Sequence, residues 1–213
     1  DSVDSFANLQ YILMCGTGVG YSVERRCVDT LAVVPSIITR AHDTCIVVED
    51  SREGWCDALK TLMASLYAGV HPTWDTSKVR PKGARLKTFG GRASGPAPLE
   101  AVFKFVSNMM YKARGRRLST LECHDICCVI AQSVIVGGVR RSAMISLSDL
   151  EDREMAGAKS GNWFESHSYR SLANNSAVYN GKPTMGKFME EWSSLYNSFS
   201  GERGILNREA LEK

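Results

Sequence analysis

One arginine stands inside a glycine-rich stretch, residues 87–98, where its side chain could bind an anionic ligand. Three glycines, a serine and two prolines surround Arg92. Glycine lets the backbone approach a ligand closely, and a guanidinium can make two parallel hydrogen bonds to a phosphate. Residues 76–99 contain no acidic side chain, and several basic ones precede the glycines. The pattern predicts a loop that binds an anion, and a mobile, solvated basic loop is the alternative.

A second glycine-rich loop, residues 15–20, has the spacing G-x-G-x-G. Its backbone N–H groups could hold phosphate or ribose oxygens. The last spacing of a dinucleotide-binding fingerprint is missing, so a tight turn without a ligand is an equal alternative. A third glycine pair, Gly137-Gly138, precedes Val139-Arg140-Arg141, and a helix end with solvated arginines is the preferred interpretation there.

Nucleophilic and metal-binding patterns are weak. The four histidines are scattered and share no motif, and the seven cysteines include no Cys-x-x-Cys pair. Unpaired cysteines among apolar neighbours favour a reducing cytoplasm. Cys123, His124, Cys127 and Cys128 could suggest a metal site. We prefer a buried helix, because Ser119 and Glu122 have the spacing of a capping box and the pattern continues as apolar residues.

Composition sets broad limits. With 44% hydrophobic and 23% charged residues among 213, the chain can form a core. A net charge of +3 is too small to argue for a nucleic-acid partner, and no apolar run has the length of a membrane helix. The chain begins without a methionine and shows no signal-peptide pattern. We therefore expect a piece of a longer protein, with no membrane or nucleic-acid partner.

The hydrophobic pattern predicts an α/β fold with parallel strands and crossover helices. The sequence contains no internal repeat and no obvious linker, so we expect one domain. Strands are expected at 21–23, at 45–48 as a short buried strand, at 143–148 and at 176–179; helices are expected after the Ser51 cap up to Gly69, at 99–114, after Ser119, and at 185–199 with Phe188, Trp192, Leu195, Tyr196 and Phe199 inward.

Seven motifs, taken in order, resemble the ribonucleotide reductases, and most closely the adenosylcobalamin-dependent (class II) branch with its monomeric ribonucleoside-triphosphate reductases. The resemblance covers nearly the whole chain, which makes it far more specific than any single motif. The motifs are residues 15–23 (CGTGVGYSV), 50–55 (DSREGW), 80–83 (RPKG), 90–96 (GGRASGP), 124–128 (HDICC), 137–143 (GGVRRSA) and 201–205 (GERGI).

The resemblance implies a ten-stranded α/β barrel, of which residues 1–213 would be roughly the first half, including the effector-specificity region. It implies conversion of ribonucleoside triphosphates to deoxyribonucleoside triphosphates for DNA synthesis, by thiyl radical chemistry that adenosylcobalamin initiates. The implied partners are a ribonucleoside triphosphate substrate, a deoxynucleotide effector and a thioredoxin-like reductant.

The resemblance also assigns residues. Cys15 and Gly16 match glycine-loop positions whose backbone meets the substrate, and Asp1 matches an aspartate that binds the sugar of the effector. The loop that links effector identity to substrate choice would comprise Gly90, Gly91, Arg92, Ala93, Ser94 and Gly95, with Arg92 and Ser94 in contact with the ligand.

The catalytic cysteines of the family would lie outside this sequence. None of the seven cysteines is therefore expected to be catalytic, and the chain alone is expected to be inactive. Arg203 stands where the family usually has proline in Gly-Glu-Pro-Gly. The alternative is a stand-alone nucleotide-binding regulatory module without catalysis. A flavin or nicotinamide oxidoreductase is disfavoured by the missing fingerprint spacing and ribose-binding acid.

Overall fold

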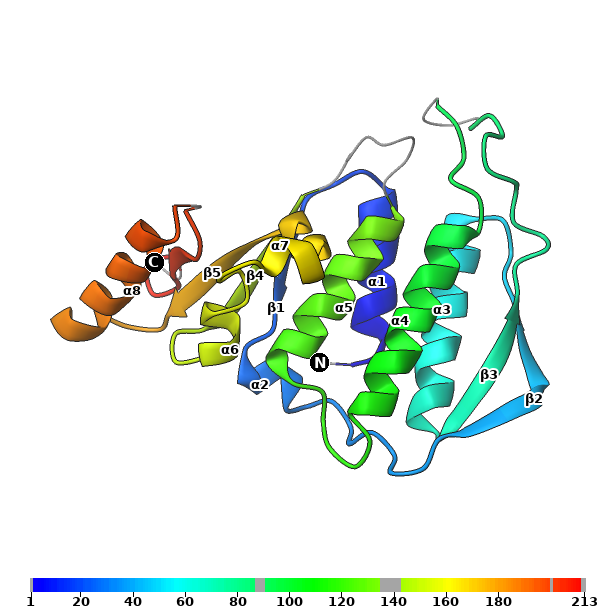
Figure 1. Ribbon diagram of the computed structural model, residues 1–213, viewed down its shortest axis with the longest axis horizontal. Coiled ribbons are helices and arrows are strands. Elements are labelled where there is room, and N and C mark those ends of the chain that lie inside the picture. The colour runs from blue at the N-terminus through cyan, green and yellow to red at the C-terminus, as the bar shows by residue number, and fades with distance from the viewer. Residues whose placement is uncertain (1, 87–90, 135–142, 200, 212–213) are drawn as a thin grey trace.

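The computed structural model describes residues 2–86, 91–134, 143–199 and 201–211. A four-stranded sheet, a group of long helices and a two-stranded sheet follow one another across the molecule (Figure 1). The elements are α1 Asp4–Met14, β1 Val19–Ser22, α2 Arg25–Val28, β2 Thr39–Val47, α3 Arg52–Tyr67, β3 Val70–Asp75, α4 Ala97–Lys112, α5 Thr120–Ser133, β4 Met144–Asp149, α6 Arg153–Ala156, α7 Trp163–Ser166, the 3-10 helix η1 Ser168–Leu172, β5 Ala173–Tyr179, α8 Met185–Asn197 and β6 Gly204–Asn207.

The larger sheet has the strand order β1-β4-β5-β6, and all its neighbouring strands are parallel. Parallel neighbours need a crossover connection, and each of these pairs has one. The connection from β1 to β4 is very long, because residues 23–143 lie between two strands that pair directly. The predicted α/β fold with parallel strands and crossover helices is confirmed.

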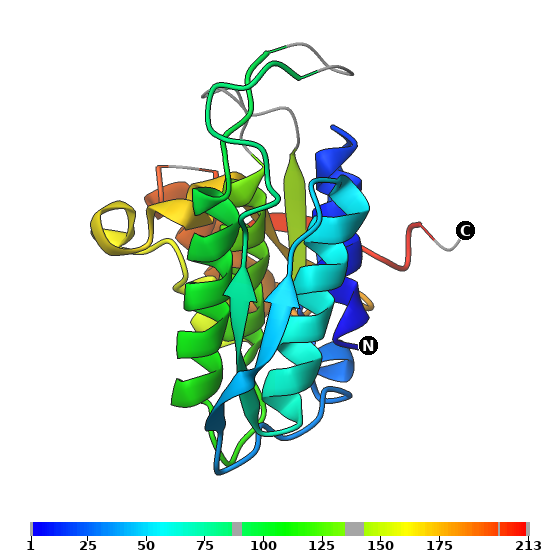
Figure 2. The same cartoon turned by 90° about the vertical axis from the view of Figure 1, so that its right-hand side faces the viewer.

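Four long helices pack between the two sheets. Helix α1 lies against α3 and α5, and α4 lies against the same two helices. Figure 2 shows β2 and β3 on the outer side of this helical layer. The core that joins the layers is apolar, and its fully buried side chains include Leu13, Leu59, Leu62, Met63, Leu66, Leu99, Phe103, Met110, Ile126, Ile130 and Met144.

The predicted boundaries of two helices are confirmed, because local caps define them. The Ser51 side chain accepts a hydrogen bond of 2.9 Å from the Gly54 N–H at the start of α3. Ser119 and Glu122 form the predicted capping box at the start of α5. Each cap satisfies backbone N–H groups that have no partner inside the helix.

The two-stranded sheet differs from expectation. The strand expected at 45–48 is longer, and most of its side chains are exposed; Val47 retains 48% of its accessible surface. Its partner β3, Val70–Asp75, was not expected as a strand, because the sequence predicted a basic loop over residues 71–95. A short apolar run does not show how many faces of a strand are covered, so the expectation of a buried strand was wrong.

Helix α8 forms as expected, but its aromatic residues do not face a core. Trp192, Tyr196 and Phe199 are 51%, 74% and 93% exposed. No residue of α8 is buried by the described part of the chain. The spacing of apolar residues identified one face of a helix correctly, whereas the inward orientation that we expected was wrong. Within the described ranges, no helix is both long and apolar enough to cross a membrane.

Candidate functional site

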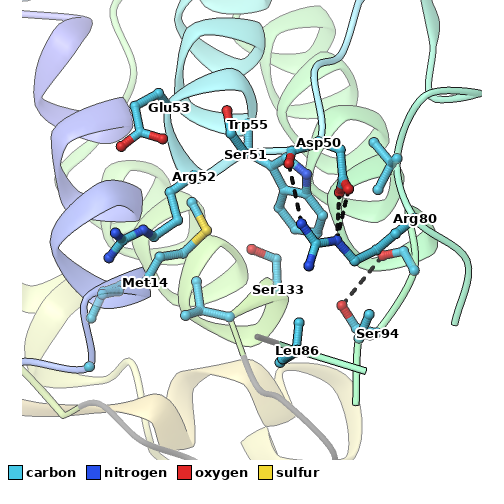
Figure 3. A pocket seen from close by; sticks show the side chains of 16 residues that line it. Met14, Asp50, Ser51, Arg52, Glu53, Trp55, Arg80, Leu86, Ser94 and Ser133 are labelled. Carbon is cyan, nitrogen blue, oxygen red and sulfur yellow. Dashed lines mark hydrogen bonds and ion pairs between the residues drawn. The ribbon is translucent and has the colours of Figure 1, made fainter. Parts of the chain in front are cut away.

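A cavity of about 420 Å³ opens where α1 and α5 end and α3 begins (Figure 3). Residues 79, 80, 86 and 93–95, from the chain between β3 and α4, line its other side. The cavity is lined by Leu13, Met14, Gly16, Asp50, Ser51, Arg52, Glu53, Trp55, Val79, Arg80, Leu86, Ala93, Ser94, Gly95, Ser133 and Val134.

The cavity brings together residues from both glycine-rich loops. Gly16 lines it from the end of α1, and Ala93, Ser94 and Gly95 line it from the other side. These positions are far apart in the sequence, and each had been assigned to a nucleotide contact by family resemblance. Their shared cavity is the main relationship that the sequence alone did not reveal.

Gly16 is a glycine for a local reason. Its φ is +79°, and its N–H donates a hydrogen bond of 2.9 Å to the Leu13 carbonyl at the end of α1. This left-handed helix ending strongly favours glycine. The tight-turn interpretation is therefore correct for the backbone, and the same turn places Gly16 on the cavity wall.

Cys15, the other predicted substrate contact, lies beside the cavity rather than in its lining. The Arg52 Nη1 atom donates a hydrogen bond of 3.3 Å to the Cys15 sulfur. The Arg52 guanidinium also lies 5.8 Å from the centre of the Tyr11 ring. These contacts join the end of α1 to the start of α3.

The loop after Arg80 folds back on itself. The Gly83 N–H donates to the Ala93 carbonyl at 2.9 Å, and the Ala93 N–H donates to the Ala84 carbonyl at 2.8 Å. Gly95 has a φ of +75°, and a Cβ atom there would lie 2.9 Å from the Lys82 nitrogen. Backbone hydrogen bonds thus hold Ala93 against Gly83 and Ala84, and Gly95 packs closely against Lys82.

Arg92 does not line the cavity. It is exposed, and its Nη1 atom donates a hydrogen bond of 2.9 Å to the Gly83 carbonyl. Gly91 is also exposed and outside the lining. Asp1 and Gly90, together with the Gly137-Gly138 motif, fall outside the described residues. The effector contacts expected for Asp1, Gly90, Gly91 and Arg92 stay predictions.

The charged residues at the centre of the site are Asp50 and Arg80. The Arg80 Nε atom lies 3.0 and 2.8 Å from the two Asp50 carboxylate oxygens, and Nη2 donates to the Asp50 carbonyl at 3.4 Å. Sequence reasoning did not identify this pair. The available signal was that each residue begins one of the motifs shared with the family, at 50–55 and 80–83.

The cavity suits a flat organic ligand with a few hydrogen-bonding groups. Its walls combine apolar side chains, including Trp55, with serine hydroxyls and one ion pair. Its volume is in the lower part of the roughly 300–1,000 Å³ range typical of small-molecule sites. Such a site provides apolar contact for a ring and directed polar contacts for its substituents.

A separate polar cluster lies buried between β1 and α5. The Tyr21 hydroxyl is 2.8 Å from His124 Nδ1, and the Cys128 sulfur is 3.6 Å from His124 Nε2. Burial lowers the pKa of His124 to about 3 and raises the pKa of Cys128 to about 12. All three groups are therefore neutral near pH 7. Among the described residues, no group of three or more His, Cys, Asp or Glu is placed to hold a metal.

Comparison with known proteins shows which proteins share this sequence and architecture. Residues 22–110 match the family model described as the insertion domain of B12-dependent ribonucleotide reductase. The adenosylcobalamin-dependent ribonucleoside-triphosphate reductase of Lactobacillus acidophilus is 30% identical over 234 residues, covering 92% of this chain and 31% of that protein. The Euglena gracilis protein of the same name is 29% identical, covering 84% of this chain and 24% of that protein. A solved B12-dependent (class II) ribonucleotide reductase superposes with a TM-score of 0.72 at 26% identity, over 82% of this chain and 28% of that one.

The chain belongs to the adenosylcobalamin-dependent ribonucleotide reductase family. It spans about 31% of the length of the Lactobacillus acidophilus reductase. The segment that matches the insertion-domain model runs from the end of β1 into α4, so it lies within the long crossover between β1 and β4. The resemblance seen in the ordered motifs is thus confirmed at the level of family and fold.

Proposed function

We propose that this chain is part of a ribonucleoside-triphosphate reductase and that its cavity binds a nucleotide. The observation that carries the proposal is that Gly16 and Ala93–Gly95 line the same cavity. Family resemblance assigns the first to the substrate and the second to the loop that senses the effector. A cavity between them provides a physical route by which one nucleotide affects the binding of another.

The proposal divides the site by residue. Cys15 and Gly16 contact the substrate through their backbone, and the loop 90–95 contacts a deoxynucleotide effector. Arg92 supports this loop through its hydrogen bond to the Gly83 carbonyl and carries positive charge at its surface. Asp1 contributes to the effector site.

The proposed domain arrangement follows the crossover. Residues 1–213 form part of the catalytic barrel domain, to which β1, β4, β5 and β6 contribute parallel strands. Residues 22–110 are an insertion between β1 and β4. Helices α3 and α4 come largely from this insertion, and in the sequence they lie before and after the cavity-lining residues Val79 to Gly95.

The proposed reaction of the longer protein is reduction of ribonucleoside triphosphates, with electrons from a thioredoxin-like reductant, in the cytoplasm. When bound, adenosylcobalamin would supply, by homolysis of its cobalt–carbon bond, the radical that initiates thiyl chemistry. The cavity of about 420 Å³ does not accommodate a corrin macrocycle with its nucleotide loop. We therefore assign none of the cofactor contacts to the residues that line it.

Nucleotide binding by the 213-residue chain tests the central claim. Isothermal titration with the four deoxynucleoside triphosphates should show saturable binding of at least one. Ser94→Phe would fill part of the cavity and should abolish binding, whereas Ser77→Phe, on an exposed loop, should leave it unchanged. Absence of binding to the wild-type chain, or equal binding by both variants, would contradict the proposal.

The stand-alone regulatory module also predicts nucleotide binding, so binding alone does not separate the two functions. The gene can separate them. Sequencing the encoding nucleic acid on both sides should reveal a cysteine just upstream and an Asn-Pro-Cys-Gly-Glu type motif downstream. Start and stop codons at these termini would favour the regulatory module.

A further inference from the structure

We propose that Arg80 anchors the nucleotide in the cavity by donating hydrogen bonds to an acceptor oxygen of the ligand, and that Asp50 is the positioning residue that orients it. This inference rests on the proposed function, because it assigns a role within the same site. It names a donor that neither the glycine motifs nor the family comparison identified.

The geometry separates the two sides of the Arg80 guanidinium. The Nε atom donates to both carboxylate oxygens of Asp50, and the Nη2 atom donates to the Asp50 backbone carbonyl. The remaining Nη1 atom points away from Asp50, toward the space bordered by Ser133, Ser94 and Leu86 (Figure 3). Within the described ranges, no hydrogen bond to Nη1 occupies this position.

The surroundings make this donor valuable to a ligand. Trp55, Val79 and Leu86 provide apolar wall beside the pair, and the Asp50 and Arg80 side chains are 34% and 37% exposed. A ligand that fills the cavity would exclude water from the pair, and a hydrogen bond gains strength where water is scarce. An arginine that is already held in place also loses less conformational entropy when a ligand binds, so its contacts favour affinity.

The pairing with Asp50 also determines what kind of contact Arg80 makes. The carboxylate balances the guanidinium charge, so the pair presents directed N–H groups rather than a free positive charge. The matching ligand group is an oxygen acceptor, which a nucleotide offers both on its phosphates and on its base carbonyls. Titration with ligands that carry only one of these groups distinguishes the two sources.

The first experiment compares wild-type chain with Arg80→Met, which keeps an unbranched apolar stem but removes every donor. Deoxynucleoside triphosphate affinity should fall roughly 10- to 100-fold, as expected for loss of a hydrogen bond to a charged group. Parallel titrations use deoxynucleosides and inorganic triphosphate. If the acceptor is a base carbonyl, deoxynucleoside binding falls as well; if it is a phosphate oxygen, only the phosphate-containing ligands lose affinity.

A double-mutant cycle tests the positioning role of Asp50. Asp50→Asn should weaken binding severalfold in the wild-type background and have no further effect in the Arg80→Met background, because Asp50 acts through Arg80. Arg80→Lys retains the positive charge but lacks the planar donor fork of arginine. Compared with Arg80→Met, it should restore the melting temperature more fully than the nucleotide affinity. These readouts separate ligand anchoring from a purely structural ion pair.

Different results contradict different claims. If wild-type chain binds none of the probes, both the proposed nucleotide site and the anchor are wrong. If wild-type chain binds and Arg80→Met binds equally well, only the anchor is wrong. If Asp50→Asn weakens binding equally in both backgrounds, the positioning role is wrong and Asp50 meets the ligand independently.

Discussion

Glu24 and Arg208 join the two outer strands of the four-stranded sheet. Glu24 follows β1 and Arg208 follows β6, and the Arg208 Nη1 and Nη2 atoms lie 2.9 and 2.7 Å from the two carboxylate oxygens. In a flat sheet, three strand spacings would separate the outer strands by about 14 Å. Extended arginine and glutamate side chains together can span about that distance, so this ion pair links the carboxyl-terminal ends of the two outer strands directly.

This pair predicts a specific loss of stability in acid. Hydrogen bonds from Arg208 and Ser22 lower the pKa of Glu24 to about 2, against the opposing effect of burial. A carboxylate with a lowered pKa stabilises the fold above its unfolded pKa of about 4.5 and loses that contribution as pH falls toward 2. The loss should reach about 3 kcal/mol.

Urea unfolding between pH 7 and pH 2 measures this contribution in Glu24→Gln. The variant should be less stable than wild type at pH 7, and the difference should shrink between pH 4.5 and pH 2. Glu190→Gln is the matched control, because Glu190 is 72% exposed and pairs weakly with Lys187 at 3.5 Å. Parallel pH profiles for wild type and Glu24→Gln would show that Glu24 is not the responsible carboxylate.

For the buried ion pair between Asp125 and Arg170, removing one partner should destabilise the fold more than replacing both partners. Its two hydrogen bonds are both 2.7 Å, and the side chains are 7% and 9% exposed. Arg170→Met leaves a buried carboxylate without its partner and should cost about 3–5 kcal/mol. The double variant Asp125→Leu/Arg170→Met should be more stable than Arg170→Met, as measured by urea unfolding. A double variant that loses the sum of both single effects would refute the interpretation.

Gln10 offers a stabilising substitution. Its side chain is completely buried in α1, and neither its amide nitrogen nor its amide oxygen has a hydrogen-bond partner among the described residues. Gln10→Met keeps the shape and removes both unsatisfied groups, so the free energy of unfolding should rise by about 1–3 kcal/mol. Gln132→Met, at an exposed position of α5, should leave it unchanged. A decrease for Gln10→Met would mean that the amide is satisfied in solution.

The cysteines of α5 should be unreactive in the folded protein. Cys123, Cys127 and Cys128 are buried, and burial raises the pKa of each thiol. The thiolate is the reactive form, so a thiol reagent at pH 8 should modify exposed Cys45 quickly and these three only after unfolding. Replacing all three with alanine should leave the fast phase unchanged. Stoichiometric zinc or iron that is lost in this variant would instead reveal a metal site.

The sequence predicted features that depend on near neighbours. Ser51 with Gly54 and Ser119 with Glu122 define helix starts within one turn, so residue types alone could identify them. The exposed aromatic face of α8 could not be identified, because helical spacing says nothing about what covers a face. The Asp50–Arg80 contact could not be predicted from the sequence either, because it depends on how β3 and the following loop return to α3.

The basic segment 76–99 has a consequence for the kinetics of binding. Lys78 and Arg80 are paired with Glu49 and Asp50, whereas Arg85 and Arg92 face each other across an antiparallel bridge next to the cavity-lining Ala93. Positive charge held at the rim attracts an anionic ligand over a distance that salt shortens. The association rate of a nucleotide triphosphate should therefore fall as ionic strength rises, while its dissociation rate, set by contacts within the cavity, should change little.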